Sequence, residues 1–202
     1  TLEALKKNKL NILSVYTQPP KKSKRGQKIN PSPIEKFCKN NAIHFSNPSS
    51  LNNESELKNF KKLLPDIVIV VAYGQIIPKA FLDIPKYGFI NIHASLLPKW
   101  RGAAPIQRAI MNSDKKIGVS IMRIEEKLDT GPVLASSELQ LDENITHGEI
   151  EKKLSLIGSK LLIKSLKTIE EGNSKFIDQD HSRATYAKKI KKNETKINWN
   201  VD

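Results

Sequence analysis

The sequence has a single cysteine, Cys38, and no long hydrophobic segment. One thiol excludes an intramolecular disulfide framework and a multi-cysteine metal site. The longest nearly apolar run, from Ile67 to Tyr73, is far shorter than the roughly 20 residues of a transmembrane helix, and the N-terminus lacks the apolar core of a signal peptide. We therefore expect a cytoplasmic protein that has no membrane partner and performs no thiol redox chemistry.

Acidic residues and glycine are also scarce. The 34 Lys and Arg residues against 21 Asp and Glu residues give a formal net charge of +13, and only 9 of the 202 residues are Gly. The positive excess favours a polyanionic partner, although a chain rich in Lys, Asn and Ile and poor in Gly is also typical of an AT-rich genome. Hydrophobic residues make up 38% and charged residues 27%, which is ordinary for a globular domain and excludes a disordered, collagen-like or coiled-coil chain.

Apolar periodicity predicts an alternation of strands and helices. The expected strands cover residues 10–16, 43–45, 66–72, 89–93, 118–124 and 132–141. Helices are expected to include residues 1–8, to begin at the capping-box patterns of Ser32 and Thr146, and to cover 54–64 and 105–111. This order predicts an α/β fold with a doubly wound, Rossmann-like, mainly parallel sheet. Because such a fold normally opens with a strand, we expect a first strand before Thr1.

Two polar residues lie near the end of the strand predicted at 89–93. Side chains alternate along a strand, so Asn91 and His93 point to one face while Ile90 and Ile92 point to the other. Ligands of open α/β sheets bind beyond the carboxyl ends of the parallel strands. The position suits catalysis, although a lone His at a strand end is more often structural.

Several ordered motifs follow and precede this strand. They are NIHASLLPKWRGAAPIQRAI at 91–110, LDTGP at 128–132, QPPKKSKRGQKINPSP at 18–33, DIVIVVAYGQIIP at 66–78 and ATYAKKIKKNETKINW at 184–199. The set closely resembles the folate-dependent formyltransferases, and within them the branch that formylates initiator methionyl-tRNA. The resemblance implies 10-formyltetrahydrofolate as the formyl donor, the formyltransferase fold, and no resident metal.

The resemblance also implies that Asn91, His93 and Asp129 are the catalytic residues. Formyl transfer to an amine places negative charge on the formyl oxygen, and this charge needs positioned donors. The Asn91 amide and a protonated His93 can supply them, and Asp129 is a candidate proton carrier through His93 or a water molecule. Without the resemblance, Asp129 would be interpreted as a turn residue before Thr130 and Gly131.

By the same resemblance, a strand-end segment is expected to line the tetrahydrofolate site. Its residues are Ser95, Leu96, Leu97 and Pro98. The alternative is a plain exit from the strand, in which the two leucines belong to the core. Trp100, close by, could serve either as a stacking surface or as a packed core residue. The four histidines lack paired ligand spacing, so we expect no metal site.

A cluster of positive charge surrounds Gly26 in a segment without periodicity, which predicts an exposed basic loop. The resemblance implies that this loop binds the tRNA acceptor arm, with contacts from Lys22, Lys24, Arg25 and Lys28. The residues Lys21 to Lys24 replace the Arg-Pro-Ala-Gly that is more common in the family before the Arg25-Gly26 pair, so the detailed contacts of the loop are open. The alternative is a solvated surface loop with no ligand.

The apolar periodicity lapses after residue 180. We expect a catalytic domain at 1–180 and a basic linker at 181–202, and the resemblance implies a C-terminal β-barrel domain beyond it. A monomer is expected. Two other functions stay open: transfer of the formyl group to a small amine, such as glycinamide ribonucleotide or a nucleotide amino sugar, and RNA binding without catalysis.

Overall fold

The computed structural model describes residues 1–23, 28–142, 145–196 and 199. Its first half contains α1 (Leu2–Lys7), β1 (Val15–Tyr16), β2 (Lys21–Ser23), β3 (Lys28–Asn30), α2 (Pro33–Asn40), β4 (Phe45–Ser46), α3 (Glu54–Leu63), β5 (Val68–Val70), α4 (Lys79–Leu82) and β6 (Phe89–His93). Its second half contains β7 (Arg101–Gly102), α5 (Pro105–Met111), β8 (Lys116–Arg123), β9 (Val133–Gln140), α6 (His147–Glu170), the 3-10 turn η1 (His181–Arg183), β10 (Tyr186–Ala187) and the 3-10 turn η2 (Lys192–Thr195).

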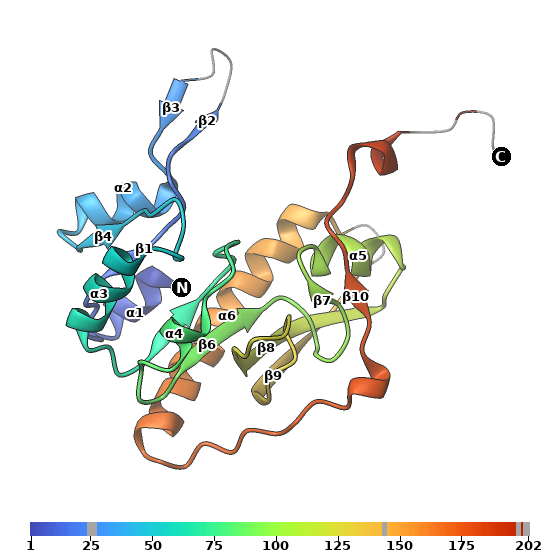
Figure 1. Ribbon diagram of the computed structural model, residues 1–202. Helices are drawn as coiled ribbons and strands as arrows, with labels where there is room; N and C mark the ends of the chain where they lie inside the picture. The colour runs from blue at the N-terminus through green and yellow to red at the C-terminus, as the bar shows by residue number, and fades with distance from the viewer. Residues whose placement is uncertain (24–27, 143–144, 197–198, 200–202) are drawn as a thin grey trace.

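The central sheet has four strands in the order β5-β6-β8-β9 (Figure 1). The expected α/β, Rossmann-like class is confirmed. Within this sheet, however, only β5 and β6 are parallel, while β8 is antiparallel to both β6 and β9. Within this sheet the expected parallel arrangement is therefore limited to β5 and β6, and it recurs in the pairs β1–β4 and β7–β10. The connection from β8 to β9 carries no helix, and without a crossover two neighbouring strands pair antiparallel.

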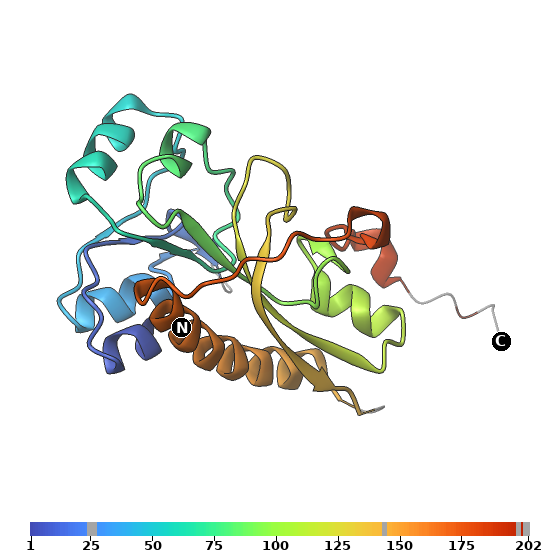
Figure 2. The ribbon, with the colours of Figure 1, turned by 90° about the horizontal axis from the view of Figure 1, so that it is seen from below.

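The long helix α6 covers one face of this sheet (Figure 2). Its N-terminus is the expected capping box, in which the Thr146 side chain accepts from the Glu149 N–H and the Glu149 carboxylate accepts from the Thr146 N–H. These hydrogen bonds lower the pKa of Glu149. Gly158 faces the sheet, and a methyl group there would lie 3.0 Å from Ile92 Cγ2, so the helix packs close beneath β6.

One core cluster lies between α6 and the two central strands. All six inner residues of β8 are buried, as expected for a strand covered on both faces, whereas β9 alternates between half-buried and exposed positions. Ile90 and Ile121 of the sheet pack against Leu162 and Ile169 of α6. This core forms the rigid base on which the end of β6 is held.

The N-terminal part has a two-stranded parallel sheet of β1 and β4. The strand expected at 10–16 forms only at its last two residues, because only Val15 and Tyr16 pair with β4. Leu10 and Leu13 remain 39% exposed. The helix at Ser32 is confirmed, with the Ser32 side chain accepting from the Glu35 N–H at 3.0 Å.

The basic segment projects from this part of the molecule as a hairpin (Figure 1). Strands β2 and β3 pair antiparallel, with Lys22 opposite Ile29 and Ser23 opposite Lys28. The expected loop is thus a β-hairpin in its described part, because backbone pairing between polar residues leaves no hydrophobic periodicity in the sequence. Residues 24–27, which include Lys24 and Arg25, lie outside the described residues.

After α6 the chain returns along the edge of the sheet (Figure 1). Ile177 bridges to Val133 at the start of β9, and β10 then pairs in parallel with β7, placing Tyr186 opposite Arg101. A segment far along the chain is in this way hydrogen-bonded beside the end of β6.

Candidate active site

His93, the last residue of β6, lies at the centre of a polar cluster. The residue is 5% exposed, and its Nε2 atom lies 2.8 Å from the Trp100 carbonyl oxygen. A carbonyl oxygen only accepts hydrogen bonds, so Nε2 carries the hydrogen and donates it. The Nδ1 atom faces the Asp129 carboxylate at 3.7 Å. One ring nitrogen is thus held by the backbone, and the other faces a carboxylate.

Asp129 lies on the loop between β8 and β9, with its backbone in the left-handed region at φ 49°. Its Oδ2 atom accepts a hydrogen bond from the Gly102 N–H at 2.7 Å, and its main-chain oxygen accepts one from Gln179 at 2.9 Å. Asp is among the few residues that adopt this backbone conformation with little cost. The carboxylate is therefore held toward His93 instead of simply closing a turn.

Asn91 shares the face of β6 that carries His93, as alternation along the strand predicts. It is half-buried between Val70 of β5 and Met122 of β8. Within the described part of the chain, no hydrogen bond is made by its side chain. Its amide donors are thus uncommitted, as a ligand-binding group requires.

The segment from Ser95 to Pro98 forms a braced turn after β6. Ser95 is fully buried, and its hydroxyl donates to the Lys99 carbonyl at 2.5 Å. Ser120 of β8 donates to the Ser95 carbonyl at 2.7 Å and accepts from the Leu97 N–H at 3.1 Å. The Ser95 side chain therefore shapes the turn, whereas Leu96, Leu97 and Pro98 are half-buried, with the Leu96 side chain packed against Gly118 of β8.

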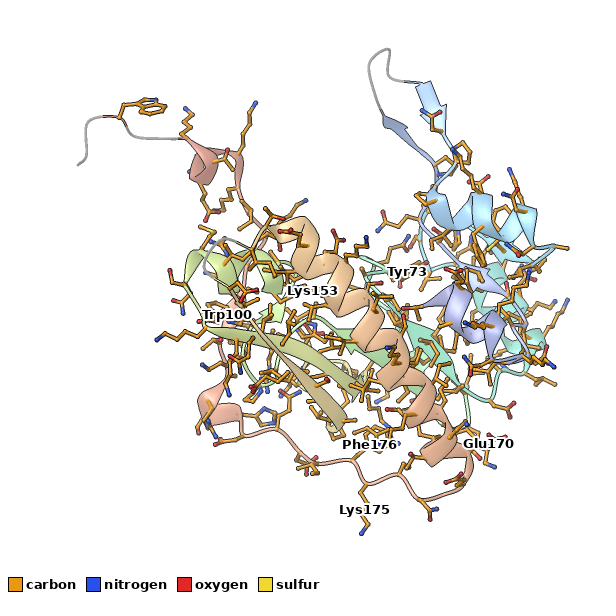
Figure 3. The ribbon with its side chains drawn as sticks, turned by 180° about the vertical axis from the view of Figure 1, so that it is seen from behind. Tyr73, Trp100, Lys153, Glu170, Lys175 and Phe176 are labelled. Atoms are coloured by element: carbon orange, nitrogen blue, oxygen red, sulfur yellow. The ribbon has the colours of Figure 1, made fainter. Side chains whose placement is uncertain are left out.

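Trp100 is a packed residue, which is one of the two roles expected for it. Its indole N–H donates to the Asp114 carboxylate at 2.7 Å, and its ring packs against the cluster that contains Ile150 and Leu154 of α6 (Figure 3). The backbone N–H of Trp100 donates to the Thr185 hydroxyl at 2.9 Å. Trp100 thus holds the carbonyl that receives the His93 hydrogen bond.

Three further residues surround this cluster that were not among the predicted site residues: Ser120, Arg101 and Gln179. Ser120 and Arg101 are 0% and 2% exposed, and Gln179 is 8% exposed. Burial of an Arg or a Gln is unusual and signals a structural or functional role. Arg101 stands inside the motif at 91–110, but no local pattern assigns any of the three residues a role, because each acts on a segment far away along the chain.

Metal ligands do not gather in the described residues: nowhere in them do three or more His, Cys, Asp or Glu side chains come together in a way that could hold an ion. The helices of the described ranges include none that is long and apolar enough to span a membrane.

The sequence pattern of the formyl transferase family matches residues 1–166. The chain belongs to the formyl transferase family. It is 52% identical over 200 residues to the methionyl-tRNA formyltransferase of Pelagibacter ubique, covering 98% of this chain and 64% of that protein. It is 47% identical over 199 residues to the enzyme of the same name from Coxiella burnetii, with 98% and 63% covered. This formyl transferase chain thus spans a little under two thirds of the length of these relatives.

Solved structures share the fold of this formyl transferase at lower identity. A phosphoribosylglycinamide formyltransferase from Anaplasma phagocytophilum aligns with a TM-score of 0.69 at 20% identity, covering 85% of this chain and 81% of that one. An N-formyltransferase from Helicobacter canadensis, in complex with folinic acid and dTDP-3-aminofucose, also aligns with a TM-score of 0.69 at 20% identity, covering 92% and 65%. At this identity the likeness supports the fold alone.

Proposed function

We propose that this formyl transferase moves a formyl group from 10-formyltetrahydrofolate to the amino group of initiator methionyl-tRNA. The observation that carries the proposal is the geometry of His93. Its Nε2 atom is committed to the Trp100 carbonyl, and its Nδ1 atom is directed at Asp129. This arrangement orients a proton-exchanging group at the end of a central strand, beside the uncommitted amide of Asn91.

In the proposed reaction, the substrate amine attacks the carbon of the formyl group and forms a new C–N bond. Negative charge develops on the formyl oxygen, where the Asn91 amide and the Nδ1–H of a protonated His93 donate hydrogen bonds, since Nε2–H is already used by the Trp100 carbonyl. The bond from the formyl carbon to the folate nitrogen then breaks. One proton leaves the attacking amine and one proton reaches the departing folate nitrogen, with Asp129 and His93 as carriers. No protein nucleophile is needed, because the amine performs the attack.

We propose the Ser95–Pro98 turn as one wall of the folate site. Its Leu and Pro side chains could pack against the flat faces of the folate rings, and the hydrogen bonds from Ser120 keep the turn rigid. Ser95 supports this wall from within, while Leu96, Leu97 and Pro98 would contact the cosubstrate.

Two basic regions support a tRNA substrate. One is the β2–β3 hairpin, where we propose phosphate contacts from Lys22, Lys24, Arg25 and Lys28. The other is a cavity of about 470 Å³ near the C-terminal segment, whose lining includes Arg108, Lys188, Lys189 and Lys191. Clusters of Lys and Arg bind polyanions by neutralising phosphates and releasing counterions.

The family resemblance also supports a proposal on the oligomeric state, the location and the domain bounds. We propose a monomeric, cytoplasmic enzyme in which residues 1–180 form the catalytic domain. Residues 181–202 pair with β7 through β10 and would then lead, as a linker, toward a C-terminal domain, consistent with relatives that are longer than this chain.

A substrate comparison tests the proposal. The full-length protein is assayed for formyl transfer to methionyl-tRNA, to glycinamide ribonucleotide and to a nucleotide amino sugar, each at the same donor concentration. We expect transfer to methionyl-tRNA to dominate, and His93→Ala and Asn91→Ala to lower it by at least ~10²-fold. Faster transfer to a small amine would favour the alternative function, and folate-independent tRNA binding without transfer would favour an RNA-binding module.

A further inference from the structure

The Gln179 side chain connects the segment after α6 to the loop that carries Asp129. Its Nε2 atom donates to the Asp129 main-chain oxygen at 2.9 Å and to the Gly131 main-chain oxygen at 2.7 Å. Gln179 is 8% exposed, so water competes little for these hydrogen bonds. A single amide therefore holds the backbone on both sides of Thr130.

Arg101 determines which way this amide points. The Gln179 Oε1 atom accepts from Arg101 Nε at 3.1 Å and from Arg101 Nη2 at 2.8 Å. The opposite orientation would set N–H groups against the guanidinium and an oxygen against two carbonyls, so only the observed orientation satisfies all four hydrogen bonds. The Arg101 charge also polarises the amide and strengthens its donors.

Arg101 is itself held by the returning segment. It is 2% exposed, and its Nη2 atom lies 2.9 Å from His181 Nδ1. Its backbone N–H donates to the Thr185 carbonyl at 2.9 Å, within the pairing of β7 and β10. The next residue, Gly102, donates to the Asp129 carboxylate. Both ends of the Gly102–Asp129 hydrogen bond thus depend on residues 179–187.

We propose that Gln179 is a positioning residue for Asp129, oriented by Arg101, and that residues 179–187 therefore belong to the active site. The inference rests on the proposed formyl transfer. It also extends it, because Gln179 and Arg101 are new residues in this role and residues 179–187 lie beyond the 1–166 matched by the family pattern. Gln179 touches neither substrate nor cosubstrate; it acts by keeping the Asp129 carboxylate opposite His93.

Two substitutions separate positioning from mere filling of space. Gln179→Leu removes every hydrogen bond of the side chain. Gln179→Glu keeps an acceptor for Arg101 but has no donor for the Asp129 and Gly131 carbonyls. In both variants of the full-length protein we expect kcat to fall about 10- to 100-fold, since small displacements of a catalytic group cost that much. The KM for 10-formyltetrahydrofolate should change by less than about threefold. Gln140→Glu, at an exposed position of β9, is the control and should leave kcat unchanged.

Amide hydrogen exchange provides a readout that needs no substrate. Exchange at Gly102 N–H should rise by at least about tenfold in both variants, because its acceptor becomes mobile. In the unmodified protein, the Gln179 side-chain NH₂ protons should exchange slowly and show NMR couplings to the Asp129 and Gly131 carbonyl carbons. If the unmodified protein shows this protection but transfers no formyl group, the proposed function fails and the positioning contact stands.

Other outcomes overturn the inference. Normal kcat in Gln179→Glu would mean that the residue serves only to satisfy Arg101. Rapidly exchanging Gln179 NH₂ protons in the unmodified protein would contradict the contact even if neither variant folds.

Discussion

Replacing Asp129 with Asn separates the charge of this residue from its position. Asp129 Oδ2 accepts from the Gly102 N–H at 2.7 Å and faces His93 Nδ1 at 3.7 Å. Asn has nearly the same shape, keeps an oxygen for Gly102, and also tolerates the left-handed backbone found here. The Asp129→Asn variant should therefore keep the local structure and lose only the negative charge opposite His93.

The expected loss of activity is large and the expected loss of stability is small. A positioned proton carrier is worth ~10²- to 10⁴-fold in rate, so kcat of Asp129→Asn should fall by that factor. Its free energy of unfolding should fall by less than about 1 kcal/mol, because a neutral hydrogen bond replaces a charge-assisted one. Asp129→Ala should lose about 2 to 4 kcal/mol, because it leaves the Gly102 N–H unpaired and places Ala in the left-handed region.

Single-turnover formyl transfer to methionyl-tRNA and urea unfolding measure the two effects in the same variants. Turnover of Asp129→Asn within about threefold of the unmodified enzyme would refute the role of the charge, since even the weakest proton transfer contributes more. Equal stability of the Asn and Ala variants would refute the structural part, because it would mean that Gly102 does not depend on this acceptor.

Three further predictions concern packing, pH and salt. A methyl group at Gly131 would lie 2.1 Å from the Arg123 carbonyl oxygen, so Gly131→Ala should lower the free energy of unfolding, measured by urea titration, by about 1 to 3 kcal/mol. The control is Gly148→Ala, where a methyl group would have nothing within 4 Å, and it should be neutral or stabilising. Hydrogen bonds from Arg108 lower the pKa of Glu194 from 4.5 to about 2, so the stability that this pair contributes is complete above pH 4.5 and disappears as the pH falls toward 2. Amide exchange of the C-terminal segment should reveal this loss. The Glu194→Gln variant should abolish the pH dependence. Alanine at all four hairpin contacts should weaken tRNA binding and flatten its dependence on salt while folate affinity stays constant, and an unchanged salt slope would contradict the assignment. The four residues proposed as hairpin contacts are Lys22, Lys24, Arg25 and Lys28.

Features that depend on neighbouring residues could be predicted from the sequence. The strand Phe89–His93 and the helix Pro105–Met111 have the expected bounds, because alternation and a Pro at the first helical position are local signals. Asn91 and His93 share a face for the same reason. Asp129 entered the site only through family resemblance, since no local rule relates a turn residue to a strand that ends 36 positions earlier.

Features that depend on distant partners could not be predicted. The β2–β3 pairing joins polar strands without any hydrophobic period. The antiparallel direction of β8 depends on how its connections cross the sheet, which apolar patterns do not encode. In the sequence, Ser120 is one small residue of a buried strand. Its role depends on two distant partners, because its hydroxyl donates to the Ser95 carbonyl and accepts from the Leu97 N–H.

The position of Asp129 explains why residues 179–187 lie against the sheet. The described pairing of β8 with β9 ends at Met122 and Val133, so residues 129–131 lie outside it and their carbonyls need other donors. A donor must therefore come from another segment, and it must reach two carbonyls at once. The Gln179 amide meets both requirements, but only if its oxygen is occupied on the opposite side, where Arg101 lies. Burial of a guanidinium without a carboxylate partner is costly. The hydrogen bonds from Arg101 to the Gln179 oxygen offset this cost, and the same hydrogen bonds orient the Gln179 amide toward the Asp129 loop.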